Sequence, residues 1–194
     1  MNLFEATYLS QVQKANFLNQ NPKVLWLTGF SGAGKTTIAK LLETQLIENQ
    51  YLTAVLDGDN IRLGLGKDLG FSQADRSENV RRVAEVAKIL ANNGLIVIVA
   101  LISPQIEMRQ QAKEIIGQVD FLEIYVQATL AVCAQRDVKG LYKKAINGEI
   151  ENFTAISQSY QEPKNPFLIV NTNQQTPQES AEFIYKKVIG LIEK

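Results

Sequence analysis

The chain has 194 residues, enough for one domain with a sizeable core, and 45% of them are hydrophobic while 21% are charged. Twenty basic residues balance twenty acidic ones, which argues against a nucleic acid or a membrane surface as the main partner. Histidine is absent and Cys133 is the single cysteine. These counts exclude a structural zinc site and leave Asp, Glu, Lys or Tyr for any proton transfer.

The same features favour a soluble, cytoplasmic protein, with an organelle left open. One cysteine forms no internal disulfide, which suits a reducing compartment. The apolar run at residues 95–102 is only eight residues long, too short to span a membrane. The first residues lack the basic-then-apolar order of a secretory signal.

Taken in order, the chain first presents residues 1–20, which are rich in Gln and Asn and predict either a leading helix or a loose arm. Pro22 ends this segment, and Val24–Leu27 is a short buried-strand pattern. Directly after that strand the chain matches G-x-x-x-x-G-K-[ST] at every fixed position, with Gly29, Phe30, Ser31, Gly32, Ala33, Gly34, Lys35 and Thr36. From Thr37 onward, apolar side chains recur at helical spacing.

This strand, loop and helix predict a nucleoside triphosphate site. Glycines let backbone N–H groups close around phosphate oxygens, and the helix N-terminus adds its positive dipole end. We expect Lys35 to reach the β- and γ-phosphates of ATP, and the Thr36 hydroxyl to ligate Mg²⁺. Thr37 completes the predicted nucleotide site. A Rossmann site is excluded because no third glycine completes G-x-G-x-x-G.

Further strands and helices alternate along the chain. The predicted elements are a strand at 53–56, a glycine-punctuated stretch at 64–70, a long helix capped by Ser72 and ending at Asn93-Gly94, a strand at 95–101, a helix beginning at Ser103-Pro104, a strand at 121–126, a short helix at 130–136, a strand at 167–170 and a final helix capped at Thr176. Residues 137–166 give little strand signal and predict a lid.

The alternation predicts an α/β fold, a P-loop NTPase three-layer sandwich around a mostly parallel five-stranded sheet. We expect residues 21–194 to form a single kinase domain. Ligands bind such sheets beyond the carboxyl ends of the strands. That rule brings Asp57–Asn60 and Ser103 to the same rim as the phosphate loop.

Two carboxylates at the end of the second strand suit phosphoryl transfer. Asp59 could accept the proton of an attacking hydroxyl or hold that hydroxyl in line, and Asp57 could orient the Mg²⁺ shell through water. An Asp-Gly pair in isolation is more often a solvated turn. Its position beside the phosphate loop favours the catalytic interpretation.

Longer blocks of the sequence resemble the adenylyl-sulfate kinases. These blocks run through residues 56–62, 67–72, 75–82, 102–104, 135–145 and 151–154, and the resemblance spans residues 21–172. It implies that ATP and adenosine 5′-phosphosulfate (APS) give ADP and 3′-phosphoadenosine 5′-phosphosulfate, with Mg²⁺ as cofactor and a homodimer as the assembly.

The resemblance also implies a substrate pocket. Phe71 and Phe153 would stack on the adenine of APS, and the planar forks of Arg62 and Arg76 suit phosphate and sulfate oxygens. The other implied substrate contacts are Asn60, Asn79, Ile102 through its backbone, Ser103 and Lys139, with Arg136 on the ATP side. Each type has an ordinary alternative, because single phenylalanines are usually core residues and helical arginines usually face solvent.

Some points stay open. Ser103 could carry a phosphoserine intermediate or only contact the substrate, and we favour direct in-line transfer because phosphoryl transfer chiefly needs positioning and charge neutralisation. Leu63, Gly66, Ala155 and Ser157 depart from the family pattern. Another small-molecule P-loop kinase, or an inactive nucleotide-binding regulator, remains an alternative.

Overall fold

The structure is a computed structural model that describes residues 8–137, 140–150, 153–154 and 159–194. The strands are β1 (Val24–Thr28), β2 (Thr53–Asp57), β3 (Ile96–Ala100), β4 (Phe121–Gln127) and β5 (Leu168–Asn171). The helices are α1 (Gln11–Leu18), α2 (Lys35–Glu48), α3 (Gly58–Leu63), α4 (Gln73–Asn92), α5 (Ile106–Ile116), α6 (Leu130–Arg136), α7 (Leu141–Ile146) and α8 (Pro177–Ile192).

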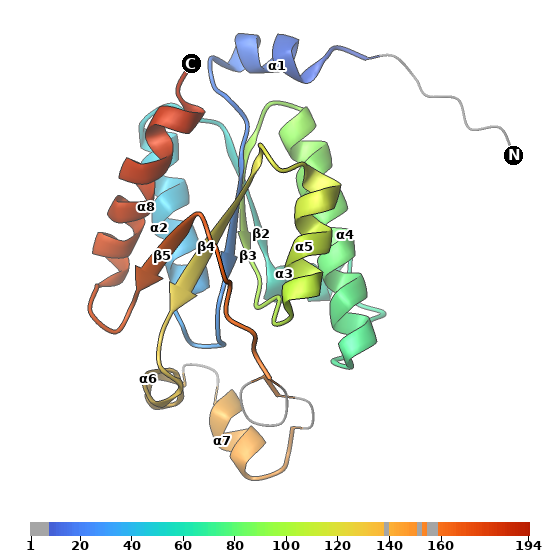
Figure 1. Cartoon of the computed structure of the whole chain (residues 1–194), viewed down its shortest axis with the longest axis vertical. Coiled ribbons are helices and arrows are strands. Elements are labelled where there is room, and N and C mark those ends of the chain that lie inside the picture. Colours follow the sequence, from blue (N-terminus) through green and yellow to red (C-terminus); the bar gives the residue numbers. More distant parts are fainter. Residues whose placement is uncertain (1–7, 138–139, 151–152, 155–158) are drawn as a thin grey trace, which may run out of the picture.

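The five strands form one parallel sheet in the order β2-β3-β1-β4-β5. Strand β1 lies at its centre, where Val24 pairs with Val97 on one side and with Phe121 on the other. Strands β1 and β3 are buried along their whole length, which explains why their apolar residues are continuous rather than alternating. All carboxyl ends therefore meet at one edge, where α6 and α7 lie (Figure 1). The predicted fold class is confirmed.

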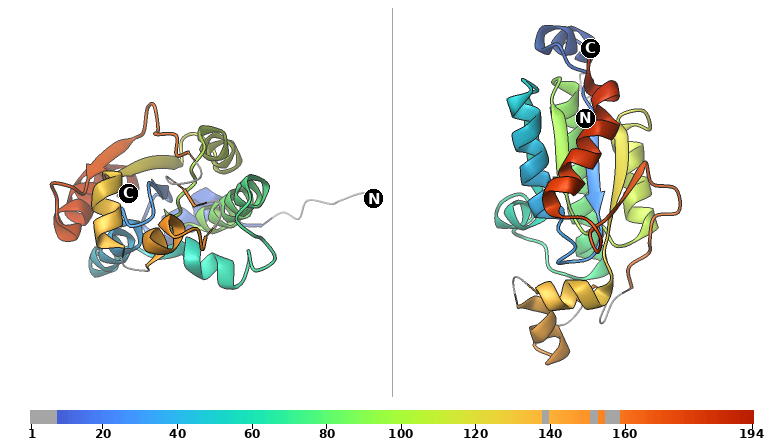
Figure 2. Two further views of the ribbon diagram at one scale, coloured as in Figure 1. Left: turned by 90° about the horizontal axis from the view of Figure 1, so that it is seen from below. Right: turned by 90° about the vertical axis from the view of Figure 1, so that its left-hand side faces the viewer.

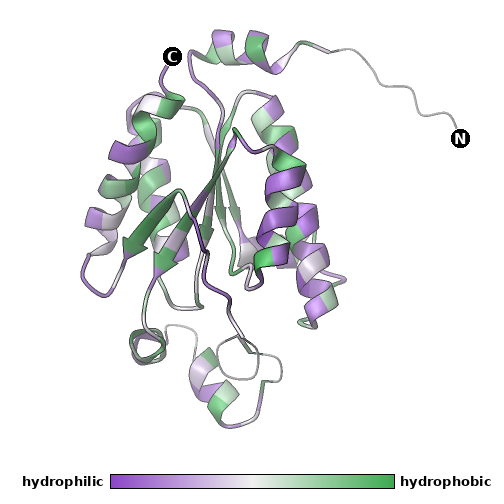
Figure 3. Cartoon of the chain, in the orientation of Figure 1, coloured by the Kyte–Doolittle hydropathy of each residue, from purple (hydrophilic) through white to green (hydrophobic). Residues whose placement is uncertain are grey.

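Helices cover both faces of the sheet and complete the three layers (Figure 2). On one face, Leu25 and Ile124 of the sheet pack with Leu42 of α2 and Ile184 of α8. On the other face, Trp26, Val83 of α4 and Met108 of α5 belong to a second apolar cluster. The strands are accordingly the most uniformly hydrophobic segments, while the helices alternate hydrophobic and polar residues (Figure 3). Within the described chain, no helix is both long and apolar enough to cross a membrane.

Most predicted boundaries agree with the structure, and one is wrong. Ser72 caps α4 by accepting a hydrogen bond from Asp75 N, and Thr176 forms a capping box on α8. The helix after β3 does not begin at Ser103-Pro104; its N-cap is Gln105. Proline disfavours helical backbone at the residue before it, and Ser103 has a φ of +38°.

The N-terminal segment and the predicted lid each contain a helix. Helix α1 follows Ser10, whose side chain forms a capping box, and lies at the sheet edge opposite α6 and α7 (Figure 1). Gln20 fixes the segment, because its buried side chain bonds both Leu52 and Gly94. Helix α7 falls inside residues 137–166, for which no clear element is predicted.

Candidate active site

The phosphate loop joins β1 to α2 through a backbone that requires glycine. Gly29, Gly32 and Gly34 have φ values of +148°, +77° and +105°. A Cβ atom at Gly29 would lie 2.3 Å from Val126 O, and one at Gly32 would lie 3.0 Å from Cys133 O. Larger residues are therefore excluded by conformation and by space at the same time.

The carbonyl oxygens of residues 29–33 each accept a hydrogen bond from a side chain. The pairs are Lys35 Nζ with Gly29 O (2.9 Å) and Phe30 O (2.8 Å), Tyr142 OH with Ser31 O (2.8 Å), Arg136 Nη1 with Gly32 O (3.4 Å) and Thr172 Oγ1 with Ala33 O (3.0 Å). In a trans peptide the C=O and the following N–H point in opposite directions. Holding the carbonyls against the protein thus turns the amides toward the position of a bound phosphate.

Thr36 and Asp57 form the pair of oxygens that suits a magnesium ion. Thr36 Oγ1 donates to Asp57 Oδ2 at 2.7 Å. Asp57 is 8% exposed and caps α3, with its Oδ1 accepting from Asp59 N at 3.0 Å. Mg²⁺ prefers oxygen ligands and usually keeps waters and phosphate oxygens, so two protein oxygens beside a phosphate loop fit it.

Asp59 and Asn60 open helix α3 at the carboxyl end of β2. Both residues are exposed, while the neighbouring Asp57 is buried. The backbone thus separates the two predicted roles: one carboxylate is fixed against Thr36, and the other lies at the solvent-accessible mouth. An exposed carboxylate at this edge can be reached from solvent, and its catalytic role stays a prediction.

The acceptor side of the site brings two arginines to one aromatic ring. The guanidinium carbons of Arg62 and Arg76 lie 4.3 and 5.7 Å from the centroid of Phe71. Arg62 Nη1 donates to Gly70 O, and Arg76 Nε donates to Phe71 O. Burial lowers the pKa of both arginines, and the charge of Arg62 lowers that of Arg76 further. Both groups stay charged, so the pocket offers a partly desolvated anion site.

Asn79 follows Arg76 on α4 and carries a buried acceptor that meets no partner in the described part of the chain. Its side chain is 2% exposed, and its Oδ1 has no hydrogen-bond partner among the described residues. A Cβ atom at Gly66 would lie 2.5 Å from this oxygen. The glycine that departs from the family pattern therefore makes room for the Asn79 amide in its present position.

Ser103 is held on the protein side of the rim. It is 1% exposed, its Oγ accepts from Trp26 Nε1 at 3.0 Å, and it donates to Thr28 Oγ1 at 3.1 Å. Thr28 in turn donates to Ile102 O at 2.7 Å. This geometry favours a structural role for the hydroxyl over a phosphoserine intermediate, and its predicted substrate contact stays a prediction.

The two phenylalanines of the predicted adenine clamp differ in environment. Phe71 is 56% exposed. Phe153 is 8% exposed and packs edge-to-face on Tyr142, with ring centroids 4.9 Å apart. Lys139, with Ala155 and Ser157, lies outside the described residues. The clamp itself stays a prediction.

Comparison with known proteins identifies the family. The family model for adenylylsulphate kinase matches residues 21–171. The chain belongs to the adenylylsulphate kinase family. An adenylyl-sulfate kinase of Clostridium acetobutylicum is 47% identical over 94% of this chain and 90% of its own. The solved Mycobacterium tuberculosis APS kinase CysC, in complex with AMPPNP and APS, is 44% identical, with a TM-score of 0.84 over 87% of this chain and 98% of that one. A hexameric APS kinase from Thiobacillus denitrificans is 28% identical, with a TM-score of 0.67 over 89% of this chain and 30% of that one.

Several residues of this kinase that shape the site gave no sequence signal. Arg109 is 3% exposed and donates to Glu123 Oε1 (2.6 Å), Ser103 O (2.7 Å) and Gln161 O (2.7 Å). It thereby connects Ser103 at the rim to Gln161 in the last part of residues 137–166. Gln161 lies 52 residues from Arg109 in the sequence, and no local pattern marks a partner at that separation.

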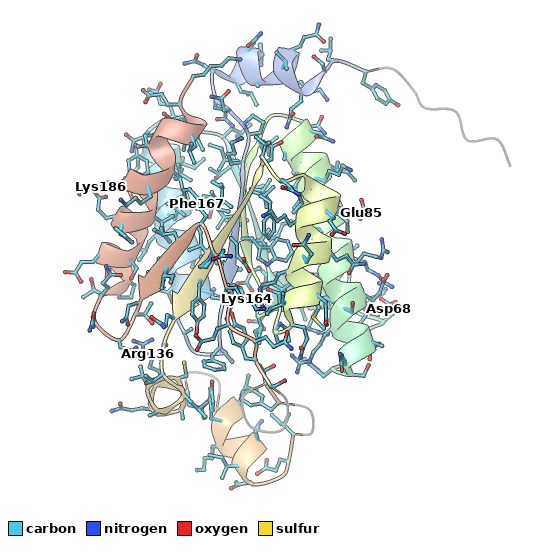
Figure 4. The ribbon with its side chains drawn as sticks, viewed as in Figure 1. Asp68, Glu85, Arg136, Lys164, Phe167 and Lys186 are labelled. Atoms are coloured by element: carbon cyan, nitrogen blue, oxygen red, sulfur yellow. The ribbon has the colours of Figure 1, made fainter. Side chains whose placement is uncertain are left out.

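Two more residues of this type lie at opposite sides of the site. Arg82 pairs with both oxygens of Asp68 and donates to Leu65 O, which fastens the glycine-punctuated stretch to α4. Thr172 follows β5, and its carbonyl accepts from Arg136 Nη2 at 2.6 Å. Arg136 and Asp68 are labelled in Figure 4, which shows them on the two flanks of the sheet edge.

A pocket of about 190 Å³ opens beside Arg76. It is lined by Gln73, Arg76, Pro104, Gln105, Met108 and Ser159. Arg76 is the one cation of this lining, and it is 8% exposed. The pocket thus extends the acceptor side of the kinase toward α5.

Proposed function

We propose that the protein transfers the γ-phosphoryl group of ATP to the 3′-hydroxyl of the APS ribose, which gives ADP and 3′-phosphoadenosine 5′-phosphosulfate. The observation that carries this substrate choice is the pair Arg62 and Arg76 beside the exposed ring of Phe71. A flat ring suits a base, and two partly desolvated guanidinium groups suit a phosphosulfate tail. The solved relative at 44% identity contains AMPPNP and APS together, which supports the same two ligands here.

The residues divide the reaction between them. The loop amides hold the β- and γ-phosphates, and Lys35 leaves its two carbonyl partners to neutralise the developing charge. Asp59 accepts the proton of the 3′-hydroxyl as the hydroxyl oxygen attacks the γ-phosphorus. The bond between the γ-phosphorus and the oxygen it shares with the β-phosphate breaks, and ADP leaves. Arg62 and Arg76 hold the acceptor so that its hydroxyl is in line.

Magnesium belongs to this proposal. Thr36 would ligate the ion directly and Asp57 through water, since their oxygens already lie 2.7 Å apart. When bound, the ion would supply positive charge that offsets the negative charge of the phosphates. Chelation by EDTA should abolish turnover, and added Mg²⁺ should restore it.

The decisive test is turnover by the purified protein. The protein is mixed with MgATP and APS, and 3′-phosphorylated product is followed by chromatography, with Lys35→Ala as the negative control. Product above that control supports the proposal, and none refutes it. A panel with sugar, acid and nucleoside acceptors separates the second candidate, a P-loop kinase with another acceptor. Binding of both ligands without product would indicate an inactive regulator.

Assembly, domain limits and location are part of the same proposal. We infer a cytoplasmic homodimer whose kinase domain is residues 21–194, with residues 137–166 acting as its lid. Light scattering after size exclusion gives the mass of the particle. A monomer, or a hexamer like the Thiobacillus denitrificans relative, would contradict the dimer.

A further inference from the structure

Tyr142 stands between the two halves of the site. Its hydroxyl donates to Ser31 O in the phosphate loop at 2.8 Å. Its ring packs edge-to-face on Phe153, with centroids 4.9 Å apart. The side chain is 2% exposed, so both contacts are made within a packed interior.

The far end of this connection reaches the acceptor pocket. Thr154 follows Phe153 directly, and its Oγ1 accepts from Arg76 Nη1 at 3.0 Å. Thr154 is 1% exposed and Arg76 is 8% exposed. Arg76 also donates to Phe71 O, next to the exposed ring. Contacts therefore run without interruption from Ser31 to the arginine pair.

The hydroxyl of Tyr142 keeps its proton and so remains a hydrogen-bond donor. Burial raises the pKa of Tyr142, and the neighbouring Cys133 thiol raises it further, so the group stays protonated at any ordinary pH. Ser31 O is one of the loop carbonyls whose position sets the direction of an amide. If the loop moves at Ser31, the hydrogen-bond acceptor of Tyr142 therefore moves with it.

We propose that Tyr142 is a positioning residue that couples nucleotide occupancy of the phosphate loop to the affinity of the acceptor pocket for APS. Bound phosphates fix the loop and with it Ser31 O, which fixes Tyr142. Its ring then holds Phe153, and Thr154 holds one guanidinium nitrogen of Arg76. The coupling is reciprocal, so APS strengthens nucleotide binding by the same factor. The proposal rests on the proposed function, because it assumes that APS is the acceptor.

The experiment measures coupling directly. Isothermal titration calorimetry gives the Kd of APS for the protein alone and for the protein saturated with AMPPNP, and their ratio is the coupling factor. Tyr142→Phe removes the bond to Ser31 and keeps the ring against Phe153. Thr154→Val removes the bond to Arg76 at the other end. Tyr185→Phe is the matched control, because Tyr185 packs partly buried against the same apolar cluster without touching the site.

For the wild type we expect a coupling factor of at least about five. Tyr142→Phe and Thr154→Val should each lower it at least about threefold toward one, and Tyr185→Phe should leave it unchanged. In the double variant the two losses should not multiply, because both substitutions interrupt one connection.

Several results would overturn the inference. They are a wild-type factor of one, an unchanged factor in Tyr142→Phe with only AMPPNP affinity lost, or losses that multiply in the double variant. If Tyr142→Phe does not fold, an unchanged factor in Thr154→Val is sufficient to reject it. Failure of the wild type to bind APS at all would reject the proposed function instead.

Discussion

The two halves of the site differ in how far their polar groups are satisfied. In the phosphate loop, the carbonyls of residues 29–33 each accept a side-chain donor. On the acceptor side, Arg62 and Arg76 lie close together in a partly desolvated pocket. Asn79 Oδ1 is buried there without a partner among the described residues. The loop half is internally hydrogen-bonded, while the acceptor half keeps a buried acceptor, Asn79 Oδ1, that has no partner among the described residues.

This difference has an energetic meaning. A buried polar atom without a partner costs about 1–3 kcal/mol, and neighbouring like charges add to that cost. A ligand that brings negative charge and a hydrogen-bond donor removes both costs when it binds. The acceptor half thus gains affinity when a ligand meets these groups, while the side-chain bonds of the loop orient its amides and bound phosphates then hold it in place. Substitutions that act on one half, on the other, or between them test this division.

The largest effect is expected between the halves, at Asp59. Asp59→Asn keeps the size of the side chain and removes the base, so kcat should fall about 10³-fold. Kd values for AMPPNP and APS, measured by calorimetry, should change less than about threefold. Unchanged turnover would remove Asp59 from the mechanism. A parallel Glu48→Gln variant, altered at an exposed position of α2, indicates what loss of a carboxylate charge alone does.

Lys35→Ala should damage the nucleotide half alone. It removes the donor to Gly29 O and Phe30 O together with the charge for the phosphates, and we expect kcat/KM for ATP to fall about 10²–10³-fold. The Kd of APS without nucleotide should be unchanged. Lys40→Ala, at an exposed position of the same helix, is the matched control. An equal loss in both lysine variants would point to a general effect of charge.

Phe71→Ala should damage the acceptor half alone. Loss of a stacking ring is worth about 1–3 kcal/mol, so the Kd of APS should rise between about fivefold and 150-fold while AMPPNP binding is retained. Phe17→Ala, at an 88% exposed position on α1, controls for removal of an exposed ring. An effect confined to AMPPNP would reverse the assignment of the two pockets.

The sequence predicted those features that depend on local pattern. Continuous apolar runs gave the parallel sheet, and the Gly29–Thr36 spacing gave the phosphate loop because backbone geometry there demands glycine. It could not predict Tyr142 or Thr172, whose function is to meet loop carbonyls more than a hundred residues away. The helix start after β3 was wrong for a local reason, because the residue before a proline disfavours helical backbone and Ser103 has a φ of +38°. The role of the Ser103 hydroxyl, by contrast, depends on distant residues. Trp26 and Thr28 engage the Ser103 hydroxyl, and no pattern around Ser103 reveals them.

The smallest effect on turnover is expected at Ser103. Ser103→Ala should change kcat less than about fivefold, because its buried hydroxyl is already bonded to Trp26 and Thr28. It should instead lower the free energy of unfolding by about 1–3 kcal/mol, measured in urea, because Trp26 Nε1 loses its acceptor. Ser180→Ala is the control: Ser180 Oγ is buried without a partner among the described residues, so its removal should not destabilise the fold. Loss of turnover in Ser103→Ala with stability intact would restore the phosphoserine route, since a hydroxyl that carries the phosphoryl group is needed for chemistry and not for folding.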